Sequence, residues 1–193
     1  MHRTPLALTG LTLAAALTVP LTACQPKAPE PSLVGGPFQL VDQDGRPVTE
    51  AVLNGKWSVV FFGYTFCPDF CPNTLTALKR VETELGSRAK NLQVVFISVD
   101  PARDTPAQLK TYVENDAFPR DTLGLTGTPE QVKAVAKAYR VYFQKNGEGE
   151  DYLVDHSTVA YLMDPKGRFV RPLAYGTAPA EMAKAIRDAM RQA

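Results

Sequence analysis

Residues 57–72 read WSVVFFGYTFCPDFCP, and this stretch decides the fold. Its first half, residues 57–64, is a continuous apolar and β-branched run, which is typical of a strand covered on both faces of a parallel sheet. It leads into residues 72–85, where apolar side chains recur at helical spacing, and Gly86 stands where a helix would end. The stretch therefore predicts a buried strand that turns into a helix, with two cysteines at the junction.

The rest of the chain supplies further strands and helices in an order that indicates the fold class. A second apolar run at residues 92–99 follows the helix, so the two runs are expected to form central parallel strands. Helices are predicted where a capping residue, Asp104 or Thr105 for one helix and Thr128 for the next, precedes a proline or an apolar repeat, and hairpins where turn residues separate short strands. The predicted helices are residues 105–117, 128–139 and 179–190, and the predicted hairpins pair residues 38–41 with 46–49 and 158–163 with 169–173. This order predicts an α/β, thioredoxin-like fold with a central mixed sheet flanked by helices and an extra N-terminal β-hairpin.

The first 23 residues differ in composition from the rest of the chain. His2 and Arg3 precede a short apolar core, a combination that is typical of an export signal. This core is too short to span a bilayer. It ends in LTAC at residues 21–24, which resembles the lipobox of bacterial lipoproteins, in which cleavage precedes the cysteine and the cysteine is acylated. The resemblance implies lipidation of Cys24; an ordinary secretory signal with an incidental cysteine is the alternative.

The chain of 193 residues is thus predicted to have three segments. They are a lipoprotein signal peptide at residues 1–23, a proline-rich flexible tether at 24–34 and one thioredoxin-like domain at 35–193. Removal of the signal takes away one of 21 basic residues and leaves 20 against 20 acidic ones, so the formal net charge becomes zero. This balance argues against nucleic-acid binding, which usually needs a basic face. We expect an exported protein, lipid-anchored to a membrane and facing the periplasm or the cell exterior.

Cys67 and Cys71 lie where the first buried strand turns into the first helix. Pro72 disfavours α conformation at Cys71 and is itself favoured at a first helical position, so Cys71 is the predicted N-cap residue and Cys67 a loop residue. The partial positive charge at a helix N-terminus stabilises thiolate, the form that attacks disulfides and binds metals. We therefore expect both thiols to be reactive.

Three interpretations of the cysteine pair compete. A structural disulfide is allowed outside the cytoplasm, but so short a loop constrains little chain entropy. A thiol–disulfide oxidoreductase usually spaces its cysteines as C-x-x-C, and the loop here is one residue wider. The wider loop favours a metal, because two thiolates can hold a soft ion such as copper(I), although zinc accepts the same atoms.

His156 is the candidate third ligand, because it is the only histidine that follows the predicted signal peptide. It lies just before the strand predicted at residues 158–163, in a loop that faces the first helix N-terminus in a thioredoxin-like sheet. Thioredoxins have a proline in this loop, whereas this chain has none between Pro129 and Pro165. A ligand in place of that proline is the favoured interpretation, and a surface or capping histidine is the alternative.

Three motifs in this order resemble the Sco/SenC family. They are GYTFCPDFCP at residues 63–72, VDPARDTP at 99–106 and VDHS at 154–157, and the resemblance covers residues 31 to about 190. It implies a metallochaperone that serves maturation of the dinuclear copper centre of cytochrome c oxidase. The implied partners are the copper-bearing subunit of the oxidase, with other periplasmic copper carriers as further candidates.

The resemblance also assigns the ligands, because Cys67, Cys71 and His156 match the family positions that bind copper. One copper ion per chain is implied, as Cu(I) or Cu(II), in a copper-binding domain at residues 35–193. A metallochaperone is not an enzyme. The alternative is a thiol–disulfide oxidoreductase that keeps a partner's copper-ligand cysteines reduced while Cys67 and Cys71 cycle through a disulfide; peroxidase chemistry is more remote.

Acidic residues near the motifs are candidates for supporting roles. Asp100 is a candidate partner of the ligands or a weak ligand, and capping of the following turn is the alternative. Asp155 is a candidate for orienting the His156 ring, as carboxylates often do beside a metal. Arg103 and Asp104 are expected to form an ion pair that orders their loop.

Aromatic residues flank the two thiols. Tyr64, Phe66 and Phe70 are expected either to form a docking surface or to cover the end of the sheet.

Overall fold

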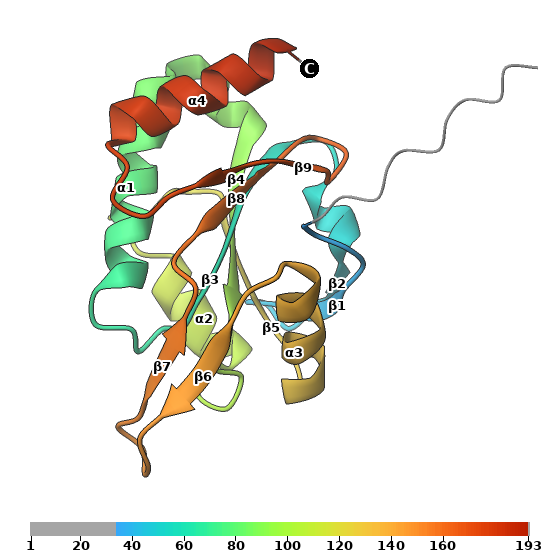
Figure 1. Ribbon diagram of the computed structural model, residues 1–193, viewed down its shortest axis with the longest axis vertical. Helices are drawn as coiled ribbons and strands as arrows, with labels where there is room; N and C mark the ends of the chain where they lie inside the picture. Colours follow the sequence, from blue (N-terminus) through green and yellow to red (C-terminus); the bar gives the residue numbers. More distant parts are fainter. Residues whose placement is uncertain (1–33, 193) are drawn as a thin grey trace, which may run out of the picture. The chain divides into compact units, whose positions relative to one another are not determined.

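The computed structural model describes residues 34–192 of the chain. The predicted signal peptide, almost all of the predicted tether and Cys24 lie outside the described residues. The described part is built around a seven-stranded sheet with the order β2-β1-β5-β4-β3-β8-β9 (Figure 1). Its strands are β1 (Gln39–Asp42), β2 (Pro47–Thr49), β3 (Trp57–Gly63), β4 (Leu92–Ser98), β5 (Thr122–Thr126), β8 (Ala160–Met163) and β9 (Phe169–Leu173). The helices are η1 (Glu50–Leu53), α1 (Phe70–Leu85), η2 (Gly86–Asn91), α2 (Pro106–Val113), α3 (Pro129–Ala138) and α4 (Pro179–Gln192).

The centre of the sheet is the parallel pair β3 and β4, as predicted. The strands pair along their whole length, and every residue of β3 is buried. Successive side chains of β3 point to opposite faces: the Phe61 ring lies 5.1 Å from the Phe96 ring on one face, and the Phe62 ring lies 5.4 Å from the Tyr139 ring on the other. Because the strands are parallel, both carboxyl ends meet at one edge, and the segments that follow β3 and β4 come together there.

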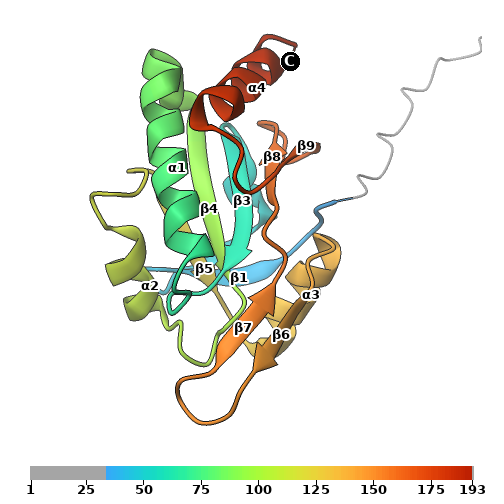
Figure 2. The same cartoon turned by 60° about the vertical axis from the view of Figure 1, so that its left-hand side comes forward.

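Helices cover both faces of the sheet. α1 and α4 lie against each other on one face, and α3 lies on the other (Figures 1 and 2). The sheet is mixed, because β8 runs antiparallel to β3 and β1 runs antiparallel to β5. The N-terminal hairpin of β1 and β2 forms one edge of the sheet. The fold is thioredoxin-like with this added hairpin, as predicted.

The cap predictions hold for two helices and fail for a third. The Thr105 hydroxyl accepts a hydrogen bond from the backbone N–H of the third residue of α2, and Thr128 forms a capping box with Gln131 at the start of α3. α1 begins at Phe70 with Asp69 as its N-cap, so the prediction of Cys71 as N-cap is wrong. The first turn of a helix tolerates a proline, since its N–H groups have no intrahelical partner, and the helix can therefore begin before Pro72.

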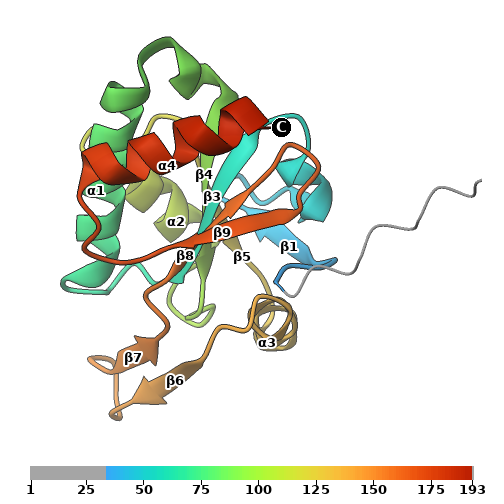
Figure 3. The same cartoon turned by 45° about the horizontal axis from the view of Figure 1, so that its top comes forward.

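The sequence did not reveal β5 or a second, two-stranded sheet. The latter consists of β6 (Phe143–Asn146) and β7 (Leu153–His156), and it extends beyond the main sheet (Figure 3). β6 and β7 consist mostly of exposed residues, so they lack an apolar run. β5 is only five residues long and contains Gly124, which weakens its strand signal. α2 also ends at Val113, before the predicted boundary at residue 117.

Within residues 34–192, no helix combines the length and the apolar character that crossing a bilayer requires.

Candidate metal centre

Cys67, Cys71 and His156 converge at the sheet edge where β3 ends. Cys67 lies in the loop after β3, Cys71 in the first turn of α1, and His156 at the end of β7 rather than in a loop. One potential ligand atom from each lies within 4.8 Å of the other two, and both cysteines are free thiols. The structure thus brings together the three residues that the sequence singled out.

The spacing of these atoms suits a metal ion. The Cys71 Sγ and His156 Nε2 atoms are 3.8 Å apart. With bond lengths typical of zinc, about 2.3 Å to sulfur and about 2.0 Å to nitrogen, two ligands 120° apart are separated by about 3.7 Å. Two sulfur atoms and one imidazole nitrogen form a soft donor set that copper or zinc accepts.

Gly63, the last residue of β3, makes room for the Cys71 sulfur. A β-carbon at this position would overlap Cys71 Sγ and would lie 2.8 Å from Cε2 of Phe96. Only a residue without a side chain therefore allows the sulfur to pack against the end of the strand. Sequence reasoning missed this role, because a glycine at the end of a strand is usually assigned to a turn.

The two thiols differ in acidity. The pKa of Cys67 is lowered to about 4, mainly by a hydrogen bond from the Cys71 thiol, and also by His156 and the backbone N–H groups of Asp69 and Cys71. The pKa of Cys71 is raised, because its thiol donates to Cys67 and is buried beside the Cys67 thiolate. Without metal, the pair therefore consists of one thiolate and one thiol at neutral pH. The thiolate is the Cys67 sulfur, on the loop side of the pair.

The His156 ring is held with one nitrogen toward the cysteines. Its Nδ1 lies 2.9 Å from the Ser157 carbonyl oxygen. A carbonyl only accepts, so Nδ1 carries a proton and Nε2 is the ring nitrogen that faces Cys71. Of the two alternatives for Tyr64, a docking surface or cover for the end of the sheet, the structure favours cover: Tyr64 is buried and packs edge-on against the imidazole, with ring centroids 5.9 Å apart.

The Asp155 carboxylate does not orient this ring. Asp155 is exposed, and its Oδ2 atom lies 3.5 Å from the Asn146 side-chain amide. The reason is strand geometry: successive side chains of β7 point to opposite faces, so Asp155 and His156 cannot face each other across adjacent positions. The Ser157 carbonyl takes the role that the sequence had suggested for Asp155.

Asp104 holds Thr65, at the start of the loop between β3 and α1 that carries Cys67. Its fully buried carboxylate accepts hydrogen bonds from the Thr65 hydroxyl at 2.7 Å, the Thr65 backbone N–H at 3.1 Å and the Ser98 hydroxyl at 2.6 Å. The predicted ion pair between Arg103 and Asp104 is therefore wrong. Asp104 instead joins the end of β4 to the loop that carries Cys67.

Arg103 pairs with Asp100 and connects their loop to the β6–β7 hairpin. Asp100 accepts a 2.5 Å hydrogen bond from Arg103 Nε and a 2.6 Å hydrogen bond from the Tyr152 hydroxyl. The Arg103 guanidinium lies 3.6 Å from the Tyr152 ring centroid and 4.7 Å from that of Phe66. It also donates to the Glu150 carbonyl oxygen at 2.9 Å. Asp100 thus supports the hairpin that carries the histidine and does not belong to the group of three.

Comparisons with known proteins agree with the geometry. The SCO1/SenC family model matches residues 26–191. The mitochondrial protein SCO1 homolog 1 of Arabidopsis thaliana is 48% identical over 140 residues, which cover 72% of this chain and 41% of that protein. The chain spans about half the length of the curated relatives it matches.

Two solved structures are similar over most of the chain. The crystal structure of Arabidopsis thaliana ScoI with copper bound is 42% identical with a TM-score of 0.78, and the match covers 83% of this chain and 99% of that one. The structure of Bradyrhizobium japonicum ScoI with copper bound is 44% identical with a TM-score of 0.73, and the match covers 80% and 98% of the two chains. Both neighbours hold copper in a chain of the same fold.

Proposed function

Because the chain belongs to the SCO1/SenC family, we propose that it binds one copper ion through Cys67, Cys71 and His156 and delivers copper for the dinuclear centre of cytochrome c oxidase. The observation that carries the proposal is the convergence of two sulfurs and one imidazole nitrogen within 4.8 Å. This donor set suits copper(I), which prefers soft ligands. The ion is cargo and not a resident cofactor.

The position of the three residues suits both capture and release. The Cys67 thiolate provides an anionic donor without prior loss of a proton at neutral pH, since its pKa is about 4. His156 is half-buried, and Phe66 and Phe70 beside the centre are exposed, so a receiving protein can approach the ligands. Three protein donors leave space for a ligand of the receiving protein to enter before one of them leaves. Hand-over by ligand exchange then needs no unfolding of the domain.

Copper content tests the ligand assignment. Wild-type protein should bind one copper ion per chain, and Cys67→Ser, Cys71→Ser and His156→Ala should each lose tight binding. Asp155→Ala is the matched control, because its side chain is adjacent in sequence to His156 but contacts Asn146. Thiolate-to-Cu(II) charge-transfer absorption should appear in the wild type and in this control. Tight binding of zinc alone, or equal copper retention by His156→Ala, would refute the assignment.

Delivery is tested by transfer to the metal-free soluble domain of the copper-bearing oxidase subunit. We expect copper to move from the wild-type protein to this domain in direct contact. A dialysis membrane between the two proteins is the control, and it should slow the transfer. Equal rates with and without the membrane would mean that copper dissociates freely, which would contradict delivery.

A thiol–disulfide oxidoreductase is the second candidate, since Cys67 is a thiolate with Cys71 beside it. The backbone N–H of Cys71 donates to Cys67 Sγ at 3.4 Å, so the residues already lie in contact. Dithiol exchange with a disulfide substrate should survive in His156→Ala, whereas copper binding should not. Maturation of cytochrome c oxidase that persists in cells carrying His156→Ala would favour the oxidoreductase.

The proposal includes export and lipid anchoring at Cys24. The LTAC sequence at residues 21–24 supports it. Cys24→Ser should move the protein from the membrane fraction to the soluble fraction of the exporting cell. Equal membrane association of Cys24→Ser and the wild type would argue against acylation at this residue.

A further inference from the structure

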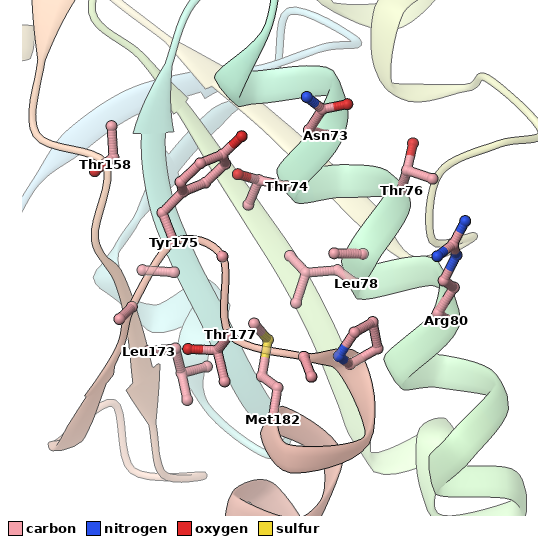
Figure 4. Close-up of a pocket in the computed structure, with 16 residues that line it drawn as sticks. Asn73, Thr74, Thr76, Leu78, Arg80, Thr158, Leu173, Tyr175, Thr177 and Met182 are labelled. Atoms are coloured by element: carbon pink, nitrogen blue, oxygen red, sulfur yellow. The ribbon is translucent and has the colours of Figure 1, made fainter.

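A groove of about 320 Å³ lies between α1 and the segment that joins β9 to α4. Figure 4 shows Leu78 of α1 in its interior, the Tyr175 ring on the opposite wall near Thr74, and the Met182 side chain projecting from α4 into the groove. Alanines, a proline and Leu173 complete much of its lining. The groove therefore presents a mainly apolar surface with hydroxyl groups at its rim.

Arg80 gives the groove its charge. It is the only charged residue among the 16 that line it, and its side chain is exposed. Within residues 34–192, Arg80 has no acidic partner and no side-chain hydrogen bond. It lies seven residues after Asn73 on α1, which corresponds to about 10 Å along the helix axis. The groove thus has an unpaired cation at one end and apolar walls along its length.

The other end of the groove adjoins the metal centre. Thr74 and Thr158 line the groove and also a cavity of about 10 Å³ whose walls include Cys71 and His156. At the rim, the exposed Phe70 ring packs edge-on against Tyr175, with centroids 4.9 Å apart. A molecule in the groove would therefore lie beside the copper ligands.

We propose that this groove docks a segment of the copper-receiving protein in which an apolar side chain is followed by a carboxylate. The inference rests on the proposed function, because it assigns the groove to the protein that takes the metal. The apolar side chain fills the space between Leu78 and Met182, and the carboxylate pairs with Arg80. Complementary charge and continuity with the metal centre favour this occupant. Docking here holds the receiving ligands at the mouth of the centre while copper is exchanged.

Two substitutions test the two halves of the docking surface. Arg80→Glu reverses the charge at an exposed position, and Ala77→Gln fills the groove with a helix-compatible polar side chain. Each should raise the receiver concentration that gives half-maximal transfer by about tenfold, without changing the copper content or the maximal rate. The effect of Arg80→Glu should shrink at high salt, whereas that of Ala77→Gln should not. Lys133→Glu is the matched control: it makes the same charge change at an exposed residue of α3, on the opposite face, and should leave transfer unchanged.

The experiment separates failure of the groove from failure of the function. If the wild type transfers copper and both variants match it, the groove proposal is overturned while the proposed function stands. If the wild type does not transfer copper, the function fails, and the groove is judged by titrating the full chain with the metal-free receiver domain. Shifts in the methyl NMR signals of Leu78 and Met182 would support docking, and unchanged signals would overturn it. If the same signals shift when the concentration of this protein alone is raised, the occupant is a second copy and the proposal is wrong.

Discussion

Replacement of Gly63 by alanine tests whether the end of β3 sets the position of the Cys71 sulfur. The added methyl group would overlap Cys71 Sγ and approach Cε2 of Phe96 to 2.8 Å, closer than real side chains come. Both neighbours are fully buried, so neither can move aside freely. Overpacking of a filled core costs about 1–3 kcal/mol. With a urea slope of about 2 kcal/mol per M, a loss of about 2 kcal/mol lowers the unfolding midpoint by about 1 M.

The assay has two readouts, urea unfolding of the metal-free protein and copper affinity by competition with a chelator. We expect Gly63→Ala to unfold at lower urea and to bind copper more weakly, because the sulfur is displaced from Cys67 and His156. Gly36→Ala is the matched control: its β-carbon would lie 3.5 Å from the Ala138 β-carbon, an ordinary contact. A wild-type midpoint and wild-type copper affinity in Gly63→Ala would refute the role of the glycine.

Three side chains around the centre give further expectations. Burial is the main cause that raises the pKa of Asp104, so the stability from its bound proton is present below the unfolded value of about 4 and is lost as pH rises through the folded pKa. Asp104→Asn removes this titration, so its free energy of unfolding should fall less than that of the wild type as pH rises from the unfolded to the folded pKa of Asp104. An unchanged pH profile would contradict this. Arg103→Ala leaves Asp100 buried without its cation and should cost about 3 kcal/mol, with faster amide exchange in β7; unaltered protection there would argue against the link to the hairpin. The thiolate absorbance of Cys67 should rise through about pH 4 in metal-free protein and at higher pH in Cys71→Ala, and a midpoint typical of a free thiol would disprove the contact.

The predictable part of the fold is the part whose signals are local or strongly apolar. β3 and β4 are continuous apolar runs, and the caps at Thr105 and Thr128 require only the next three residues. β6 and β7 escaped prediction because a mostly exposed hairpin needs no apolar pattern. The start of α1 was misplaced by the weight given to Pro72, which restricts the preceding residue without preventing a helical turn around it.

The supporting residues of the centre were harder to predict than the three candidate ligands. Asp104 and Arg103 are adjacent in sequence, and charge alone suggested that they pair. In the structure, Asp104 turns inward to Thr65, while Arg103 turns toward the hairpin and pairs with Asp100. These partners depend on which loops the sheet order brings to one edge, and no local pattern records that order.

The sequence by itself determined that two cysteines lie at the junction of a buried strand and a helix, because strand burial and helix initiation depend on neighbouring residues. It also identified the one histidine available to join them after the predicted signal peptide. Only the tertiary structure brought His156 within 3.8 Å of Cys71, 85 positions earlier in the chain, and placed the groove with Arg80 beside them. Such contacts arise from strand order and from the packing of α1 against α4, which are properties of the whole folded domain.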